Sequence, residues 1–591
     1  MTEPTTPTLS VPGLALGAAA DAYDAAVTRA RDESWATRLF DRDTTLWTTD
    51  ERVGAAIAER LGWLDAPAHF TDQIAALEGF GDGIVESGFT TAIVAGMGGS
   101  SLAPDVLHRT FGTTEGYLDL RLLDSTDPAT VAAVFGDLDP LRTLVIVASK
   151  SGTTVEPNAF LAEARDRAGT ALDRHRRHAF EGPGELMAVI TDPGKSLEAI
   201  PHHDEFRSVF LNPPDIGGRY SALTYVGLVP ASLIGLDLDA LLASASAMLG
   251  ACREPEPSAN PGVSLGLALG TMAKAGRDKL TFLADDEIAS FGAWVEQLIA
   301  ESTGKHGVGI VPIDGEPAVE PQRYGSDRAF VRLALDGAAD SDGDALADAL
   351  EAAGHPVIRI RLADPIDIGA EFVRWEVATA IAGAVLGIDP FDQPNVEEAK
   401  QLTRDVLAKA ERGEAGASPP APIADGDGIA LHGDAPLRLT SADGGVVAEL
   451  RRHLARRKPT SYLAVQAFIA ATPERDASLA RIREALLRAT GNATTLGYGP
   501  RFLHSTGQLH KGGAPIGWFL QLTSDHPDDH RIPGWAYTFG QLIDAQAAGD
   551  FAAIEAHDLP ILRVHLGSDV DAGLATLGRA LDAALAESSE G

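Results

Sequence analysis

The sequence predicts an α/β protein with two tandem parallel sheets, each covered by helices on both faces, followed by a third α/β module. Three observations predict this class. Short β-branched segments alternate with helical segments, Gly- and Ser-rich turns follow several of them, and 45% of the 591 residues are hydrophobic while 22% are charged. Such alternation is typical of parallel strands joined by crossover helices. The length allows several domains that each bury a core.

The first part of the chain predicts helices and then a sheet. Residues 1–75 have helical apolar spacing with little strand signal, so we expect an N-terminal helical segment. Residues 76–235 are predicted to form the first α/β domain. Its strands are expected at Thr91–Ala95, Asp119–Asp124, Thr143–Ala148, Leu186–Thr191 and Val209–Leu211.

The same alternation continues to the end of the chain. Residues 236–412 predict a second α/β domain, residues 413–428 a linker because they are rich in Pro, Gly and Ala, and residues 429–591 a C-terminal α/β module. The second domain is expected to have strands at Lys279–Asp285, Gly309–Pro312, Ala329–Leu335 and Pro356–Arg361, and the C-terminal module at Tyr462–Ala471, Ala493–Leu496, Gly517–Leu522 and Ile561–His565.

Charge and composition exclude several functional classes. The chain has 48 Lys and Arg against 84 Asp and Glu, a formal charge of −36, which disfavours nucleic acid and anionic membranes as partners. The single cysteine, Cys252, excludes internal disulfides and CxxC-type zinc sites. The N-terminus has no signal-peptide pattern, and the longest uncharged apolar stretch, Tyr220–Leu236, is shorter than the roughly 20 residues that span a bilayer. We therefore expect a cytoplasmic protein acting on a small molecule.

A glycine-rich loop follows the first predicted strand. Its sequence, GMGGSSL, covers Gly96–Leu102. Glycines at this point let the backbone turn tightly and direct amide groups toward an anion at the next helix N-terminus. A dinucleotide site stays open at this stage, since Asp124 ends the second strand, although the loop departs from the full GxGxxG pattern. The alternative interpretation is a glycine-rich turn that binds no ligand.

A second loop favours a phosphorylated small molecule. The strand Thr143–Ala148 runs into Ser149–Glu156, with the sequence SKSGTTVE. Hydroxyl groups and free backbone amides at a helix start bind a terminal phosphate without a net positive charge. Two adjacent loops of this kind suit one sugar phosphate better than a dinucleotide, while a Ser- and Thr-rich helix cap is the alternative.

Together, the two loops resemble those of the glucose-6-phosphate isomerase family and its sugar-isomerase (SIS) domains. GMGGSSLAPDVL and ASKSGTTVEPN match its two phosphate loops. The match continues in order with IGGRYSALTYVGL at Ile216–Leu228, AWVEQLIAESTGK at Ala293–Lys305 and GIDPFDQPNVEEAK at Gly387–Lys400. The segment Leu496–Thr523 is similar to the isomerase half of bifunctional transaldolase/glucose-6-phosphate isomerases.

The resemblance implies interconversion of glucose 6-phosphate and fructose 6-phosphate through an enediol, with no cofactor and no metal. It assigns Glu301 as the base, Arg219 as the cation beside the enediolate, and Lys400 to ring opening near the ring oxygen or O1. Glu301 also ends an apolar helical stretch, so partial burial is expected. The implied substrate-binding residues are Gly99, Ser100, Ser149, Lys150, Ser151, Thr154, Glu156 and Gln393.

The chain departs from the family at the histidine that opens the sugar ring. The stretch in which that residue is expected, Gln322–Arg332, contains no histidine. We hypothesise that His504 or His510 of the C-terminal module replaces it, because imidazole titrates near neutrality; a structural role for both is the alternative. The family histidine crosses a dimer interface, so a homodimer is expected on family grounds and a monomer stays open.

Three other functions stay open from the sequence. An isomerase with a wider pocket would also accept mannose 6-phosphate. A non-catalytic sugar-phosphate sensor would need the hydroxyl loops but no base, so Glu301, Arg219 and Lys400 together argue against it. A nicotinamide-dependent dehydrogenase is the most distant alternative and would bind a nucleotide.

Overall fold

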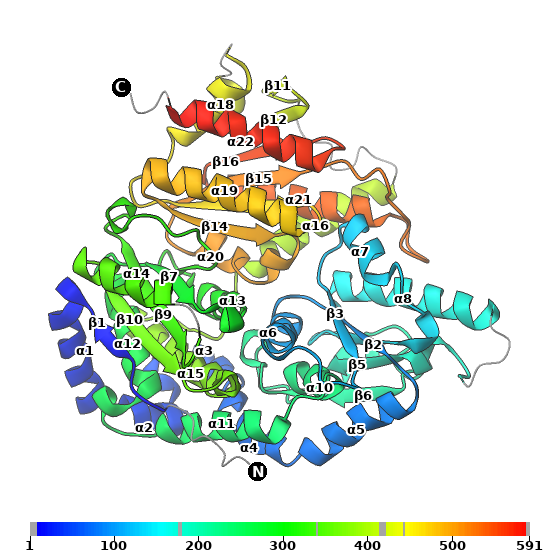
Figure 1. Cartoon of the computed structure of the whole chain (residues 1–591), viewed down its shortest axis with the longest axis horizontal. Coiled ribbons are helices and arrows are strands. Elements are labelled where there is room, and N and C mark those ends of the chain that lie inside the picture. Colours follow the sequence, from blue (N-terminus) through cyan, green and yellow to red (C-terminus); the bar gives the residue numbers. More distant parts are fainter. Residues whose placement is uncertain (1–8, 175–179, 339–340, 413–420, 441–443, 587–591) are drawn as a thin grey trace.

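Three mainly parallel sheets lie around a common centre in the computed structural model, which describes residues 9–174, 180–338, 341–412, 421–440 and 444–586. Figure 1 shows the first sheet in cyan on the right, the second in green on the left, and the third in orange and red at the top. Residues 1–8 of the predicted N-terminal segment and residues 413–420 of the predicted linker lie outside the described residues.

The first sheet has five parallel strands in the order β3-β2-β4-β5-β6. Its central strands are continuous apolar runs that are buried on both faces, as expected of a parallel sheet between two helical layers. The strands are β2 (Thr91–Gly96), β3 (Asp119–Leu123), β4 (Thr143–Ala148), β5 (Met187–Thr191) and β6 (Ser208–Leu211), and the helices are α5 (Ile74–Glu86), α6 (Leu102–Phe111), α7 (Pro128–Phe135), α8 (Val155–Arg174), α9 (Lys195–Glu198) and α10 (Tyr225–Leu233).

The second sheet has the order β1-β10-β9-β7-β8, with four parallel strands and an antiparallel edge strand from the N-terminus. Helices α12 and α15 pack along each other within its core. The strands are β1 (Gly13–Ala15), β7 (Lys279–Ala284), β8 (Val311–Ile313), β9 (Arg328–Leu335) and β10 (Val357–Leu362), and the helices are α11 (Leu238–Ala251), α12 (Pro261–Lys274), α13 (Phe291–Thr303), α14 (Ser341–Ala352) and α15 (Ile368–Leu386).

The third sheet has the order β11-β12-β16-β15-β13-β14, in which β11 and β12 are antiparallel additions to four parallel strands. Helix α16 packs along α21 of this module. The strands are β11 (Ala424–Gly426), β12 (Ile429–Gly433), β13 (Tyr462–Phe468), β14 (Ala493–Tyr498), β15 (Gly517–Thr523) and β16 (Ile561–His565), and the helices are α16 (Val396–Glu411), α17 (Ala435–Leu439), α18 (Gly445–Leu454), α19 (Pro473–Thr490), α20 (Gly507–Gly512), α21 (Phe539–Ala556) and α22 (Val570–Ala586).

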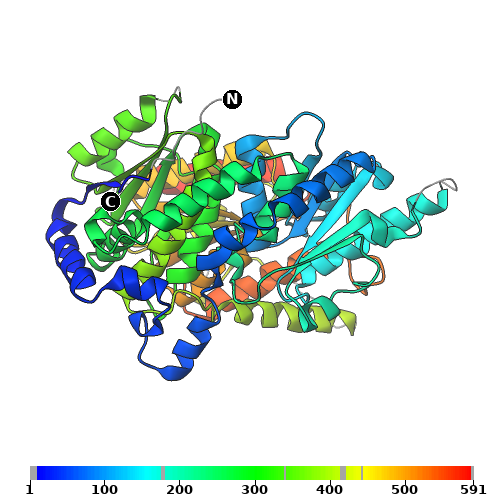
Figure 2. The ribbon, with the colours of Figure 1, turned by 90° about the horizontal axis from the view of Figure 1, so that it is seen from below.

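The N-terminal helices lie along the outside of the first two sheets. Helix α1 packs on α12, α4 on α11, and α5 on α10; Figure 2 shows these blue helices crossing the underside of the molecule. One apolar core joins this segment to both sheets and to the start of α21, while the third sheet has a core of its own. The remaining N-terminal elements are α1 (Ala20–Asp32), α2 (Trp35–Phe40), α3 (Glu51–Ala58) and α4 (Ala66–Thr71).

The predicted α/β class with parallel sheets is confirmed, and each expected strand lies within a few residues of an observed one. Three antiparallel strands were not expected. Residues Gly13–Ala15 form β1 although this segment was expected to be helical, and Ala424–Gly426 form β11 within the predicted linker. Among the described helices, none combines the length and the apolar character needed to cross a membrane.

Candidate active site

A cavity of about 540 Å³ lies where the three sheets meet. Its wall contains loops that follow β2 and β4, helix α13, the start of α16, and residues of the C-terminal module. Five Lys or Arg side chains line the cavity against three Asp or Glu, so the site is locally basic within a strongly acidic protein. Twelve of the thirteen predicted site residues line it: Gly99, Ser100, Ser149, Lys150, Ser151, Thr154, Glu156, Arg219, Glu301, Gln393, Lys400 and His504.

One wall is a hydroxyl-rich loop between β4 and α8. The Ser149 hydroxyl donates to Thr154 Oγ1 at 3.2 Å, and the hydroxyls of Ser151 and Thr153 are 3.0 Å apart. Helix α8 begins at Val155, so the free amides of its first turn adjoin these hydroxyls. This combination can hold a phosphate group.

Lys150 in the same loop is bound to the protein on two sides. Its ammonium lies 2.6 Å from Asp192 Oδ2 and donates to the Pro214 carbonyl at 3.0 Å. Burial raises the pKa of Asp192, with the Lys150 contact opposing that rise. The ammonium therefore braces the loop as well as adding positive charge to the cavity.

Arg219 is the most constrained group of the site. Its side chain is only 2% exposed, and its guanidinium donates to Ser302 Oγ at 2.7 Å and to Gln393 Oε1 at 3.0 Å. Two further bonds reach the carbonyls of Pro390 at 2.8 Å and Asp392 at 3.0 Å. A guanidinium fork with four fixed partners keeps its charge in one place.

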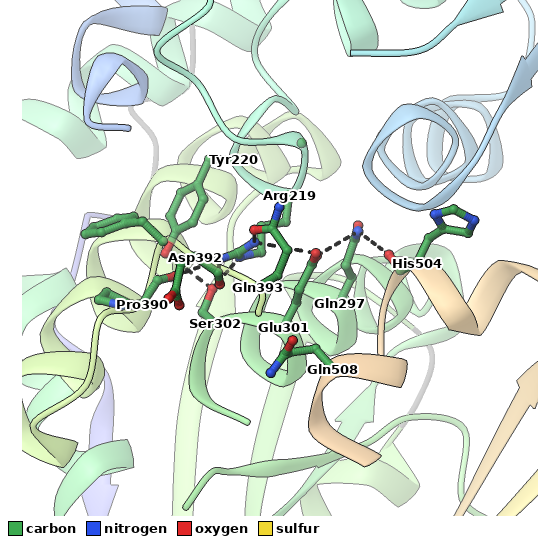
Figure 3. A network of polar contacts seen from close by, with 12 residues as sticks. Arg219, Tyr220, Gln297, Glu301, Ser302, Pro390, Asp392, Gln393, His504 and Gln508 are labelled. Atoms are coloured by element: carbon green, nitrogen blue, oxygen red, sulfur yellow. Dashed lines mark hydrogen bonds and ion pairs between the residues drawn. The ribbon is translucent and has the colours of Figure 1, made fainter. Parts of the chain in front are cut away.

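The Glu301 carboxylate faces Arg219 across the cavity wall. Oε1 lies 3.5 Å from Arg219 Nη1, and Oε2 accepts a hydrogen bond of 3.2 Å from the Gln297 amide one turn earlier on α13. Gln297 also donates to the His504 carbonyl at 2.7 Å. Figure 3 shows the resulting row from Gln393 through Arg219, Glu301 and Gln297 to His504, which joins the second sheet to the C-terminal module.

The opposite wall carries a buried carboxylate with two partners from the C-terminal module. Glu156 Oε1 lies 3.0 Å from His504 Nε2 and accepts a 2.7 Å bond from the Gln546 amide. Burial works to raise the pKa of Glu156, but the charge and hydrogen bond of His504, with a smaller effect of Lys400, hold it below its ordinary value. Glu156 is therefore ionised near neutral pH.

Two glycines of the first loop allow the surrounding segments to meet. Gly98 has φ +54°, and a Cβ there would lie 2.5 Å from the His504 carbonyl oxygen. A Cβ on Gly99 would lie 2.3 Å from the Gly218 carbonyl oxygen. The loop thus supports both the Arg219 segment and the His504 segment by close backbone approach.

Comparison with known proteins decides the family. Residues 52–315 match the phosphoglucose isomerase family. A glucose-6-phosphate isomerase of Rubrobacter xylanophilus is 30% identical over 400 residues, which cover 59% of this chain and 90% of that protein. The chain belongs to the glucose-6-phosphate isomerase family. The corresponding protein of Thermosynechococcus vestitus is 30% identical over 54% of this chain and 66% of its own length.

A solved structure supports the fold of this family member. A hypothetical protein of Thermus thermophilus superposes with a TM-score of 0.54 and 24% identity, over 67% of this chain and all of that one. The family match ends at residue 315, so His504 and Gln546 lie outside it.

His510 does not line the cavity of this isomerase-family protein. It is buried on α20, where its ring packs against Tyr462, Phe502 and Phe519 with centroids 5.1–6.0 Å apart. Burial, aided by the neighbouring Lys511, lowers the pKa of His510 well below its ordinary value. The structure therefore gives no support to the hypothesis that His510 acts on the sugar, because its buried ring is not part of the cavity wall.

The cavity also contains polar residues that sequence reasoning did not assign. Gln546 comes from α21, far along the chain from the loops that it touches. No motif in the sequence around Gln546 indicates that this residue belongs to the site. Gln297 carried a signal, since it lies four residues before Glu301 on the same helical face. The other unassigned polar residues in the wall are Arg60, Thr153, Asp192, Ser196, Thr403 and Arg404.

Proposed function

We propose that this chain interconverts glucose 6-phosphate and fructose 6-phosphate by proton transfer between C1 and C2 through an enediol(ate). The observation that carries the proposal is the position of the Glu301 carboxylate, which lies in the cavity wall 3.5 Å from the Arg219 guanidinium. The hydroxyl loop supplies a phosphate site in the same cavity.

Glu301 acts as the base. A carboxylate fixed on one oxygen by the Gln297 amide, at 3.2 Å, keeps its other oxygen toward Arg219 and the cavity. A positioned acid/base group contributes about 10²–10⁴-fold to a proton transfer. Glu301 removes the proton from one carbon of the open-chain sugar and returns it to the neighbouring carbon.

Arg219 stabilises the oxygen that becomes negative in the enediolate. Its guanidinium is already held by Ser302, Gln393 and two carbonyls, so little reorganisation is needed as charge develops. A preorganised donor of this kind contributes about 3–4 kcal/mol. Lys400 lines the cavity on α16 and is assigned to the oxygen that exchanges protons when the ring opens.

The phosphate group binds at the loop of Ser149, Ser151 and Thr154, with Ser100 from the adjacent loop. Hydroxyls and the first amides of α8 supply its hydrogen bonds. The surplus of basic side chains in the cavity offsets the negative charge of the whole chain, which would otherwise repel a sugar phosphate.

The test is a coupled assay that detects glucose 6-phosphate formed from fructose 6-phosphate, with Glu301→Gln in parallel. We expect turnover by the wild type and a fall of about 100-fold or more in the variant. Sugar-phosphate binding without turnover by the wild type would favour a sensor instead. Mannose 6-phosphate in the same assay series measures how strictly the cavity selects the C2 configuration.

A further inference from the structure

We propose that His504 opens the sugar ring by proton transfer to the ring oxygen, that Glu156 holds its imidazole, and that Gln546 and Thr126 are positioning residues for this pair. The inference rests on the proposed function. It gives the C-terminal module a direct part in the reaction and places the ring-opening group on the same chain as Glu301.

Four side chains, two from the first α/β domain and two from the C-terminal module, form one hydrogen-bonded series. The Thr126 hydroxyl donates to Gln546 Oε1 at 2.6 Å, and the Gln546 amide donates to Glu156 Oε1 at 2.7 Å. The same carboxylate oxygen lies 3.0 Å from His504 Nε2. Thr126 is fully buried and Gln546 is 3% exposed, so the series is shielded from water except at its His504 end.

The series determines which nitrogen of His504 can react. A carboxylate accepts hydrogen bonds, so Nε2 of His504 carries a proton toward Glu156. Nδ1 is then the nitrogen that gains and loses a proton, and within the described part of the chain it makes no hydrogen bond to the protein. The hydrogen bond between Nε2 and Glu156 fixes the orientation of the ring and leaves Nδ1 for the substrate.

The backbone around this pair is held rigidly. The Gln297 amide binds the His504 carbonyl at 2.7 Å, and the missing side chain of Gly98 leaves room for that carbonyl. Helix α21, which carries Gln546, is anchored to α8 by the stacked rings of Phe160 and Phe539, 6.4 Å apart. His504 is thus positioned from the side of Glu301 as well as from the side of Glu156.

Glucose 6-phosphate forms its ring through O5, so ring opening needs a proton at that oxygen. The C1–O5 bond breaks and its electron pair stays on O5, which receives the Nδ1 proton of the His504 imidazolium. The anomeric hydroxyl releases its proton to water as the C1 aldehyde forms, and water returns a proton to Nδ1. Ring closure runs the same transfers in reverse, and nothing is oxidised or reduced.

An acyclic substrate separates ring opening from the later proton transfer. Fructose 6-phosphate is cyclic through O5, whereas 5-deoxyfructose 6-phosphate lacks O5 and cannot close that ring. Turnover of the first compound therefore needs both steps. Deuterium incorporation at C1 of the second compound in D₂O needs only the base, so the pair of measurements isolates His504 from Glu301.

We expect His504→Ala to lower turnover of fructose 6-phosphate by about 100-fold or more. Deuterium incorporation into the acyclic compound should stay within about threefold of the wild type. Gln546→Met keeps the length of the side chain but removes its hydrogen bonds. It should lower the turnover of fructose 6-phosphate by about tenfold and leave deuterium incorporation into the acyclic compound unchanged. His565→Ala, in the same module but outside the cavity wall, is the matched control and should change neither rate.

Each outcome decides the inference. The inference is overturned if His504→Ala and Gln546→Met lower the rates on both compounds equally. It is also overturned if they lower neither rate. If the wild type processes neither compound, the proposed function itself fails. Glu301→Gln should lower both the turnover of fructose 6-phosphate and the deuterium incorporation. If Glu301→Gln does so while His504→Ala matches the wild type, the proposed function stands and the role of His504 in ring opening is excluded.

Discussion

Replacing Gly99 with Ala is expected to lower turnover by displacing Arg219. The added Cβ would lie 2.3 Å from the Gly218 carbonyl oxygen, and it must retreat to at least 3.0 Å, a shift of 0.7 Å or more in one of two backbone segments. Arg219 follows Gly218 directly and is held by four hydrogen bonds of 2.7–3.0 Å. A misplacement of about 1 Å costs about 100-fold in rate, or about 2.7 kcal/mol of barrier.

The assay is steady-state turnover of fructose 6-phosphate to glucose 6-phosphate. We expect kcat to fall by roughly 100-fold and KM to change less, because Ser149, Ser151 and Thr154 of the phosphate site lie in a separate loop and Ser100 alone adjoins the substitution. Gly83→Ala on α5 is the matched control, since a Cβ there meets nothing within 4 Å and Ala favours a helix. A folded Gly99→Ala variant with kcat within about threefold of the wild type would refute the reasoning.

Three further predictions concern charged groups. Arg219→Lys should lower kcat by about 100-fold or more, because an ammonium cannot span the four acceptors of the guanidinium; near-normal kcat would exclude the oxyanion role. Burial and the nearby Asp314 raise the pKa of Glu296 to about 8 from 4.5. The contribution of this group to the free energy of unfolding is therefore fully present below pH 4.5 and is lost as the pH rises through 8. Glu296→Gln should therefore melt above the wild type near pH 9 but not near pH 4, and equal Tm values near pH 9 would contradict the shift. Burial and repulsion by Arg219 lower the pKa of Lys305 to about 8 from 10.5, so the unfolded chain holds more protons between these values and stability from this group rises with pH across that window. Lys305→Met should remove that rise, and melts at several pH values check it.

The parallel strands could be predicted because each is an apolar run bounded by turn residues. β1, β11 and β12 could not, since each has only three to five residues and pairs antiparallel at or near a sheet edge through long-range contacts. Short strands of this kind depend on the neighbouring strand more than on their own side chains.

The loops and helix positions of the site could be predicted in the same local way, and twelve of the thirteen expected residues line one cavity. The position of His510 could not be predicted. It lies only six positions after His504, but His504 ends a 3₁₀ helix while His510 lies on α20. Gln546 could not be found, because its partner Glu156 is 390 residues away and only tertiary packing joins them.

That separation along the chain also sets an order of events during synthesis. A ribosome adds about 5–20 residues per second, so the 390 residues between Glu156 and Gln546 take about 20–80 s to appear. The nascent chain exposes its phosphate loops, and later Glu301, well before the last helices can dock. A product truncated before α21 would contain Glu301 and His504 but would lack Gln546, one of the two partners of the Glu156 carboxylate.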